Sequence, residues 1–435
     1  MWLFDGRTVP DIQVEPPGPK AQEWLRRDAA RVSPSYTRVY PLVVERASGC
    51  VVQDVDGNLF LDLTAGIAVT ATGHCHPQIV ASIQRQSERL IHMSGTDFYY
   101  PQQAELAERL ARGAPGSGPK KVFFCNSGAE AIEAALKLAR WHTRRPRVIA
   151  LLGAFHGRTY GAMSLSASKA VHRRGFAPLV PEIHHVPFPR TCPEEGGCSR
   201  GCRWAEELER TLLRRLAPPD EVAAIFIEPI QGEGGYYPWP PGCLPALRQW
   251  CDRHGILLVA DEVQSGMGRT GRLFAIEHYG VAPDILCLAK GIASGLPLGA
   301  VVARAEIMDW PPGSHASTFG GNPVACAAAL ATLDLLEREY LANAAARGEQ
   351  LRAGLHDLAL RHPILREVRG LGLMVAADLP SPELRDRLLG LAFRRGLLLL
   401  GCGEAALRFC PPLCITAEQI ATALRLLDEL LPQLA

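Results

Sequence analysis

Ile285-Leu286-Cys287-Leu288-Ala289-Lys290-Gly291 is an apolar run that ends in a single ammonium group followed by glycine. Such a run predicts a buried strand with a cation at its carboxyl end. The chain has only six lysines, and Lys290 is the one that follows a strand predicted to be buried. A desolvated lysine can form a Schiff base, which an arginine cannot do because its guanidinium stays protonated. A lysine that only extends its amine to solvent gives the same local pattern, so the surrounding motifs must decide.

Length and charge bound the possible classes of protein. The 435 residues exceed what one core usually supports, which is roughly 250–300 residues, so we expect two domains. Hydrophobic residues make up 47% of the chain, enough for sizeable cores. The net charge of +1 gives no reason to expect nucleic acid or an anionic membrane as a partner.

The thirteen cysteines are scattered through a long chain and do not form the framework of a small secreted domain. The apolar start Met1–Phe4 is followed at once by Asp5, so we expect no secretory leader. No apolar run is long enough to span a membrane. These features favour a cytoplasmic protein.

The pattern of the chain changes near His74. The preceding residues predict an arm with a short helix near Glu23–Arg31 and then an antiparallel meander over residues 42–62. After His74, apolar strands alternate with helices. The predicted strands are Val122–Cys125, Val148–Leu151, Val222–Ile227, Ile256–Ala260 and Ala300–Ala303, and the helices are Pro77–Leu90, Gln102–Arg112, Ser127–Arg140 and Leu244–His254. Unbroken apolar strands are typical of a mostly parallel α/β sheet covered on both faces.

We therefore expect a large domain over residues 75–330 and a smaller α+β domain. The smaller domain combines residues 1–74, the arm and meander, with residues 331–435. It should contain strands near Val368–Ala377 and Leu407–Cys410, after a long helix from Pro323 to about Glu339.

Polar residues follow four of the predicted strands, and the carboxyl ends of strands are where α/β sheets bind ligands. Asn126–Glu130 opens a helix, whose first N–H groups favour a phosphate, although Ser127 could be a plain N-cap. Asp261 could hold a pyridine nitrogen protonated or form a structural salt bridge. Phe155 could stack on a flat ring or pack in the core. Together with Lys290, the set suits pyridoxal 5'-phosphate.

At this point the sequence resembles the class III (ω-amino acid) aminotransferases, which are pyridoxal phosphate enzymes of fold type I. The resemblance runs from about Pro41 to Thr416. The motifs that carry it are Thr72–Pro77, Asn126–Glu130, Phe155–Thr159, Glu228–Gly235, Asp261–Gln264, Leu288–Gly291, Ser317–Pro323 and Arg408–Leu413.

The resemblance implies a role for each cofactor-binding residue. Lys290 should carry the cofactor as the internal aldimine, and Asp261 should pair with its ring nitrogen. The other implied contacts are Gln264 to the phenolic oxygen, Gly128 and Ala129 to the phosphate with Ser127 nearby, and Phe155 with His156 at the ring. Thr318 should reach the phosphate of the cofactor bound to the neighbouring subunit, which implies a homodimer with shared sites or a higher oligomer.

The resemblance also implies a substrate site. Arg158 should grip the distal carboxylate of the amino donor, and Glu228 and Ile67 should line the substrate side. Glu233 and Arg408 match a gate pair in which the arginine takes the α-carboxylate of glutamate. The implied reaction moves an amino group from 4-aminobutyrate, ornithine or acetylornithine to the 2-oxo acid 2-oxoglutarate by a ping-pong mechanism.

Four alternatives must be weighed. Relatives with the same motifs resemble amino-acid racemases, which need proton delivery on both ring faces. Gly266–Gly271 fits the glycine pattern of dinucleotide-binding oxidoreductases, although Asp261–Ser265 separate it from its strand. A regulatory protein with a vestigial site would be expected to lack Lys290 or Asp261, and both residues are present. A metal clasp could form from Cys192, Cys198, Cys202, His184 and His185, but its spacing is unusual and we expect no metal.

Overall fold

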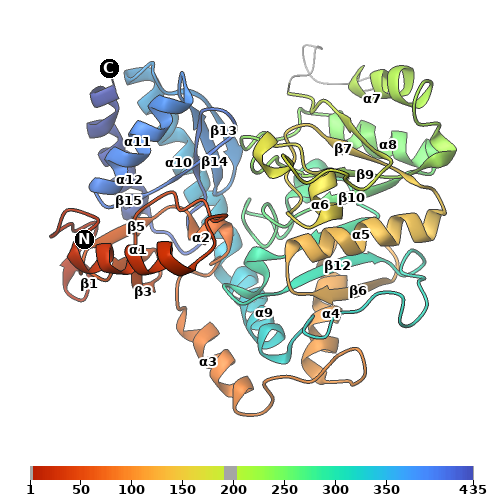
Figure 1. The fold of residues 1–435 in the computed structure, drawn as a ribbon, viewed down its shortest axis with the longest axis horizontal. Coiled ribbons are helices and arrows are strands. Elements are labelled where there is room, and N and C mark those ends of the chain that lie inside the picture. The colour runs from red at the N-terminus through yellow and green to blue at the C-terminus, as the bar shows by residue number, and fades with distance from the viewer. Residues whose placement is uncertain (1–2, 191–202, 435) are drawn as a thin grey trace.

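The computed structural model describes residues 3–190 and 203–434 (Figure 1). Its largest sheet has seven strands in the order β6-β12-β11-β10-β9-β7-β8. Their bounds are β6 Lys120–Cys125, β7 Arg147–Leu151, β8 Ile183–Val186, β9 Val222–Ile227, β10 Leu257–Asp261, β11 Ile285–Leu288 and β12 Gly299–Arg304. Only β12 runs against its neighbours β11 and β6, so the other six strands end at the same edge. The predicted mostly parallel sheet is confirmed.

The apolar strands of this sheet are buried on both faces. In β11, Ile285 and Cys287 pack in one cluster with α5 (Gly128–Thr143), whereas Leu286 and Leu288 pack in another with α8 (Cys243–His254). Because successive side chains of a strand point to opposite faces, two covered faces require the unbroken apolar runs of the sequence.

The N-terminal and C-terminal segments lie side by side, away from the seven-stranded sheet (Figure 1). The predicted meander forms from β3 (Val44–Ser48), β4 (Val51–Asp54) and β5 (Leu59–Asp62). The short strand β15 (Leu397–Leu398) pairs with β5 in parallel. The sequences of both ends of the chain therefore build one four-stranded sheet.

A second four-stranded sheet lies in the C-terminal segment. Its order is β13-β14-β17-β16, with bounds Arg366–Leu371, Met374–Asp378, Ala406–Phe409 and Leu400–Cys402. The region near Val368–Ala377, predicted as a strand, is instead the hairpin of β13 and β14. The chain reverses there because Gly370 and Gly372 adopt φ values of +127° and +53°.

The helices surround these sheets. The bounds are α1 Pro19–Arg31, α2 Ala65–Ala68, α3 Pro77–Ser87, α4 Pro101–Gly113, α6 Tyr160–Leu165, α7 Arg203–Leu208, α9 Pro323–Leu335, α10 Leu341–Arg361, α11 Pro382–Arg394 and α12 Ala417–Leu430. The long helix predicted from Pro323 does not stop near Glu339, since a π-helical turn over Leu336–Tyr340 joins α9 to α10. In the part of the chain that the structure describes, no helix is long and apolar enough to cross a bilayer.

Candidate active site

A cavity of about 420 Å³ lies at the edge where the parallel strands of the large sheet end. Ten of the residues predicted to form the site line it: Ser127, Gly128, Ala129, Phe155, His156, Arg158, Glu228, Asp261, Gln264 and Lys290. The four strand ends that carry the predicted site residues are not all neighbours, because β12 separates β6 from β11 and β9 separates β10 from β7. The intervening end of β9 is the one that supplies Glu228.

Lys290 lies two residues beyond β11 and is partly buried. Its φ of +47° lies in the left-handed region, where a side chain is strained, and such strain is typical of functional sites. Burial lowers the pKa of Lys290 and outweighs the opposing effect of Glu233 and Asp261. The amine is therefore more easily deprotonated than an ordinary lysine.

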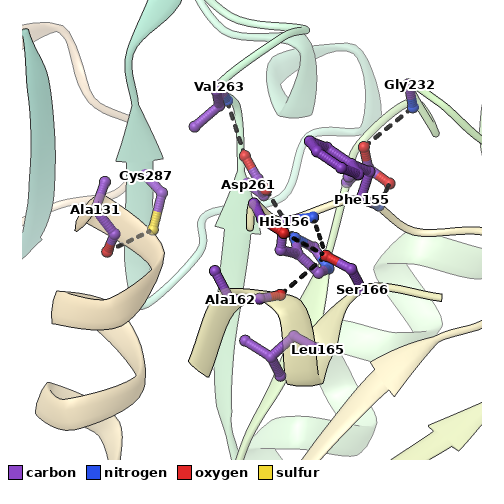
Figure 2. Close-up of polar contacts among 12 residues, drawn as sticks. Ala131, Phe155, His156, Ala162, Leu165, Ser166, Gly232, Asp261, Val263 and Cys287 are labelled. Atoms are coloured by element: carbon purple, nitrogen blue, oxygen red, sulfur yellow. Dashed lines mark hydrogen bonds and ion pairs between the residues drawn. The ribbon is translucent and has the colours of Figure 1, made fainter. Parts of the chain in front are cut away.

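Asp261 ends β10 and is held by two donors beside the cavity. Figure 2 shows the side chain between His156 and the backbone of Val263. His156 Nδ1 lies 2.7 Å from Asp261 Oδ2, and the N–H of Val263 donates to Oδ1 over 3.0 Å. Ser166 Oγ accepts the backbone N–H of His156 at 2.8 Å. Burial works against the imidazolium, but the hydrogen bond to Asp261 leaves the pKa of His156 raised.

The start of α5 has the geometry predicted for a phosphate cradle. Ser127 is the N-cap, and its Oγ accepts the N–H of Glu130 at 3.2 Å. The N–H groups of Gly128 and Ala129 come before the helical ladder, so the helix itself gives them no acceptor. A Cβ at Gly128 would lie 2.6 Å from Val263, which explains the glycine. The N-cap and cradle interpretations are therefore compatible.

Glu228 and Gln264 line the cavity with defined hydrogen bonds. The N–H groups of Gly232 and Phe155 donate to the Glu228 carboxyl at 3.1 and 3.3 Å. Burial raises the pKa of Glu228 to about 8, so this carboxyl is largely protonated at neutral pH. Gln264 Oε1 accepts the hydroxyl of Tyr236 at 2.8 Å, which orients its amide nitrogen as a donor.

Glu233 and Arg408 meet although 175 positions separate them. Arg408 Nη1, on β17, donates to Glu233 Oε1 over 2.5 Å. The arginine side chain is 5% exposed and the glutamate side chain 17%. Burial disfavours the carboxylate, but Arg408 outweighs it and lowers the pKa of Glu233. The pair is charged, and it lies close enough to Lys290 to affect its pKa.

Three predicted residues sit farther out or are exposed. Arg158 is exposed at the rim, with its guanidinium carbon 5.3 Å from the centre of the Phe155 ring. Ile67 is 44% exposed and does not line the cavity, whereas Val69 does. Thr318 is also exposed outside the cavity of its own chain. The roles of these residues stay predictions.

Sequence reasoning missed several residues of the site. Asn126, which belongs to the predicted phosphate motif but was given no role of its own, lines the cavity and donates to Ser317 Oγ over 2.9 Å. Gly295–Leu298 also line it and carry no recognisable chemical signal. Tyr236 and Ser166 act through Gln264 and His156, and only tertiary contacts could reveal them.

The structure contradicts the alternative that Gly266–Gly271 belong to a dinucleotide-binding oxidoreductase. Gly266–Gly271 form turns and do not open a helix. A Cβ at Gly268 would lie 3.0 Å from Leu413, and one at Gly271 would lie 2.9 Å from Ala345, so these glycines permit close packing. They do not form a dinucleotide loop.

The proposed metal clasp can be followed only in part. Cys192, Cys198 and Cys202 lie outside the described residues. His184 and His185 belong to β8, and across residues 3–190 and 203–434 no cluster of three metal-ligating side chains occurs.

The donor set fits pyridoxal phosphate. One end of the cavity is lined by Ser127, Gly128 and Ala129, at the helix start where N–H groups have no acceptor within the helix, and Asp261 supplies a buried carboxylate for a pyridinium. His156 Nε2 is buried without a partner among the described residues. Lys290 supplies the amine. Fold and site together define a pyridoxal phosphate enzyme of fold type I.

Comparison with known proteins agrees. The model of the family "Aminotransferase class-III" matches residues 32–431. The chain is 40% identical to an acetylornithine aminotransferase of Caldanaerobacter subterraneus, over 92% of this chain and 97% of that one. It is 40% identical to a 4-aminobutyrate aminotransferase of Mycobacterium leprae, over 97% of each. It is also 38% identical to an alanine/serine racemase of Pyrococcus horikoshii, over 97% of this chain and 92% of that one.

A solved ornithine aminotransferase of Toxoplasma gondii, described with pyridoxal phosphate in partial occupancy, superimposes with a TM-score of 0.84. It is 32% identical, and the match covers 95% of this chain and 94% of that one. The chain therefore belongs to the class-III aminotransferase family and depends on pyridoxal phosphate. The predicted family, fold class and cofactor are confirmed.

Proposed function

We propose that the enzyme moves an amino group from an ω-amino donor of the 4-aminobutyrate, ornithine or acetylornithine type to 2-oxoglutarate, giving glutamate by a ping-pong mechanism. The observation that carries the proposal is the charged Glu233–Arg408 pair, which lies close enough to Lys290 to affect its pKa. The names of the aminotransferase relatives support this class of donor.

Each residue of the site has a separate role in the proposed reaction. Pyridoxal phosphate, when bound, supplies an electron sink for the carbon that loses a proton. Asp261 holds a positive charge on the ring nitrogen, and His156 keeps Asp261 in place through their hydrogen bond. Lys290 Nζ would hold the cofactor, and as a neutral amine it would accept and return the substrate proton. The N–H groups of Gly128 and Ala129 bind the phosphate.

Glu233 lets one pocket accept two unlike substrates. An ω-amino donor brings no α-carboxylate next to the reacting carbon, and Glu233 then neutralises the buried Arg408. When 2-oxoglutarate enters, its α-carboxylate takes the arginine in a bidentate contact and Glu233 must release it. Arg158, at the rim, binds the distal carboxylate of either substrate.

We also infer a homodimer in which Thr318 completes the partner's phosphate site. Support comes from large apolar side chains exposed in this region. Phe319, next to Thr318, is 62% exposed and contacts His92, whose neighbour Ile91 is 67% exposed, and the fully exposed Tyr99 lines a hollow together with Ser317. A patch of this kind is typical of an interface. The sheet shared by β5 and β15 supports a small domain made of residues 1–74 and 331–435 beside a large domain of 75–330. The scattered cysteines support a cytoplasmic location.

Amino-acid racemisation is the second candidate function. The racemase of Pyrococcus horikoshii is nearly as similar in sequence as the aminotransferases are. Racemisation needs a second acid opposite Lys290. Glu228 is a largely protonated carboxyl in the same cavity and fits that role.

One screen separates the two functions. Amino donors are offered with pyruvate or 2-oxoglutarate, and the products are analysed on a chiral column. Glutamate formed from an ω-amino donor supports the aminotransferase. Inversion of a single amino acid without any 2-oxo acid, at a rate that exceeds transamination, would overturn it.

A further inference from the structure

Two cysteines from opposite ends of the chain meet next to the segment of residues 62–74. Cys50 Sγ and Cys414 Sγ lie 3.8 Å apart, although 364 positions separate them in sequence. Cys50 is buried directly before β4, whereas Cys414 is partly exposed in the loop between β17 and α12. A sulfur–sulfur distance of this size is a direct contact between two thiols.

The backbone of segment 62–74 holds this contact in place. The N–H of Asp62 donates to Cys50 O, and the N–H of Leu413 donates to Ala71 O, each over 2.8 Å. A Cβ at Gly73 would lie 2.6 Å from Cys414 Sγ, so only a glycine lets the thiol approach so closely. The two thiols are therefore positioned by three separate segments of the chain.

The two thiols also differ in reactivity. The hydrogen bond from Cys50 lowers the pKa of Cys414, whereas burial raises the pKa of Cys50. Cys414 is thus the more exposed thiol and the more easily ionised one, which suits it to react first. Cys50 is placed to resolve the product.

We propose that Cys50 and Cys414 form a reversible redox site. A low-molecular-weight disulfide oxidises the two thiols, and the two sulfur atoms become joined in a disulfide bond. The Cys414 thiolate attacks one sulfur of R–S–S–R, and R–S⁻ leaves. Cys50 then loses its proton, and its sulfur displaces the second R–S⁻ from Cys414. In total the protein gives up two electrons and two protons, and the reagent becomes two R–SH molecules.

The bond would tie the N-terminal meander to the loop that follows β17. Residues 62–74 include Val69, which lines the cavity, and β17 carries Arg408. Because the bond closes a very long loop of chain, it should restrict the unfolded state and raise the melting temperature. For the bond to form, the two sulfur atoms must close from 3.8 Å to about 2.05 Å.

The test uses the full-length holoenzyme and oxidised glutathione. The protein is incubated without denaturant at rising ratios of oxidised to reduced glutathione, free thiols are alkylated, and the digest is analysed by mass spectrometry without reduction. The expected result is a linked peptide pair that contains Cys50 and Cys414 and disappears with dithiothreitol. The oxidised protein should melt several degrees higher than the same sample after reduction.

Two variants sharpen the result. Cys50→Ala should form no link and should leave Cys414 bound to glutathione, whereas Cys402→Ala, which removes a buried thiol of β16, should link as the wild type does. If a variant fails to fold, the digest of the wild-type protein still tests the proposal. Alkylation of both cysteines at every ratio, or glutathione on Cys414 with Cys50 still free, overturns the proposal.

Discussion

Replacing Glu233 with glutamine should shift the preference of the enzyme between its two substrates. Among the described residues, the Glu233 carboxylate supplies the one recorded hydrogen bond to the Arg408 guanidinium, at 2.5 Å. The amide of the variant keeps the shape but not the charge. Arg408 then stays buried without a counterion while an ω-amino donor binds. When glutamate binds instead, its α-carboxylate no longer has to displace the Glu233 carboxylate from Arg408.

The burial of the pair sets the size of the effect. Breaking a fully buried ion pair costs about 3–5 kcal/mol. Because the Glu233 side chain is 17% exposed, the lower end applies. A difference of about 3 kcal/mol corresponds to roughly 150-fold, since each 1.36 kcal/mol is tenfold. Relaxation of the glutamine amide recovers part of this, so we expect the ratio of kcat/KM for glutamate to that for the ω-amino donor to rise by roughly 10- to 150-fold.

Stopped-flow measurement of each half-reaction tests this directly. Glutamate turnover should hold or rise, and ω-amino donor turnover should fall. Arg408→Ala should do the opposite, crippling the 2-oxoglutarate half while sparing the donor half. Asp284→Asn is the matched control, because it breaks the Arg248–Asp284 pair of 2.7 Å, with side chains 16% and 10% exposed, at the other edge of the sheet. Equal losses in both halves for Glu233→Gln would reduce the pair to a structural role.

Four further predictions follow from the site. Lys290→Ala should lose the cofactor adduct that borohydride traps on the wild type. If peptide mapping of the reduced wild type places the adduct on another lysine, the assignment is refuted. Asp261→Asn should slow loss of the substrate proton by orders of magnitude while cofactor is retained, as single-turnover absorbance will show. Mixing inactive Lys290→Ala and Thr318→Ala chains should restore partial activity through hybrid dimers, whereas full cofactor affinity in a proven monomer would exclude sharing. Burial raises the pKa of Glu228 from 4.5 to about 8, so the folded state binds the extra proton and loses stability as pH rises between these values. As pH rises across that range, the melting temperature of Glu228→Gln should therefore increase relative to that of the wild type. A difference in melting temperature that stays constant with pH would contradict the raised pKa of Glu228.

Local pattern in the sequence was enough for the fold class and for the central chemistry. The run Ile285–Leu288 is apolar at every position because both faces of the sheet are covered, and that requirement is visible without any tertiary contact. Lys290, Asp261 and Ser127 each lie at or just after the carboxyl end of a strand, so their position at one edge of a parallel sheet could be predicted. The strand β8 escaped notice because His184 and His185 interrupt its apolar character.

Long-range pairing was decided only by the tertiary structure. The contact of Cys50 with Cys414 spans 364 positions and was not expected, whereas the Glu233–Arg408 pair, across 175 positions, was implied by the family resemblance and not by any local pattern. No periodicity reports such contacts, because they depend on how β17 and the loop after it pack against residues from distant parts of the chain. The insertion of β12 between β6 and β11 is equally invisible in sequence. Strand order depends on the free energy of the whole packed core, whereas strand formation depends on a few consecutive side chains.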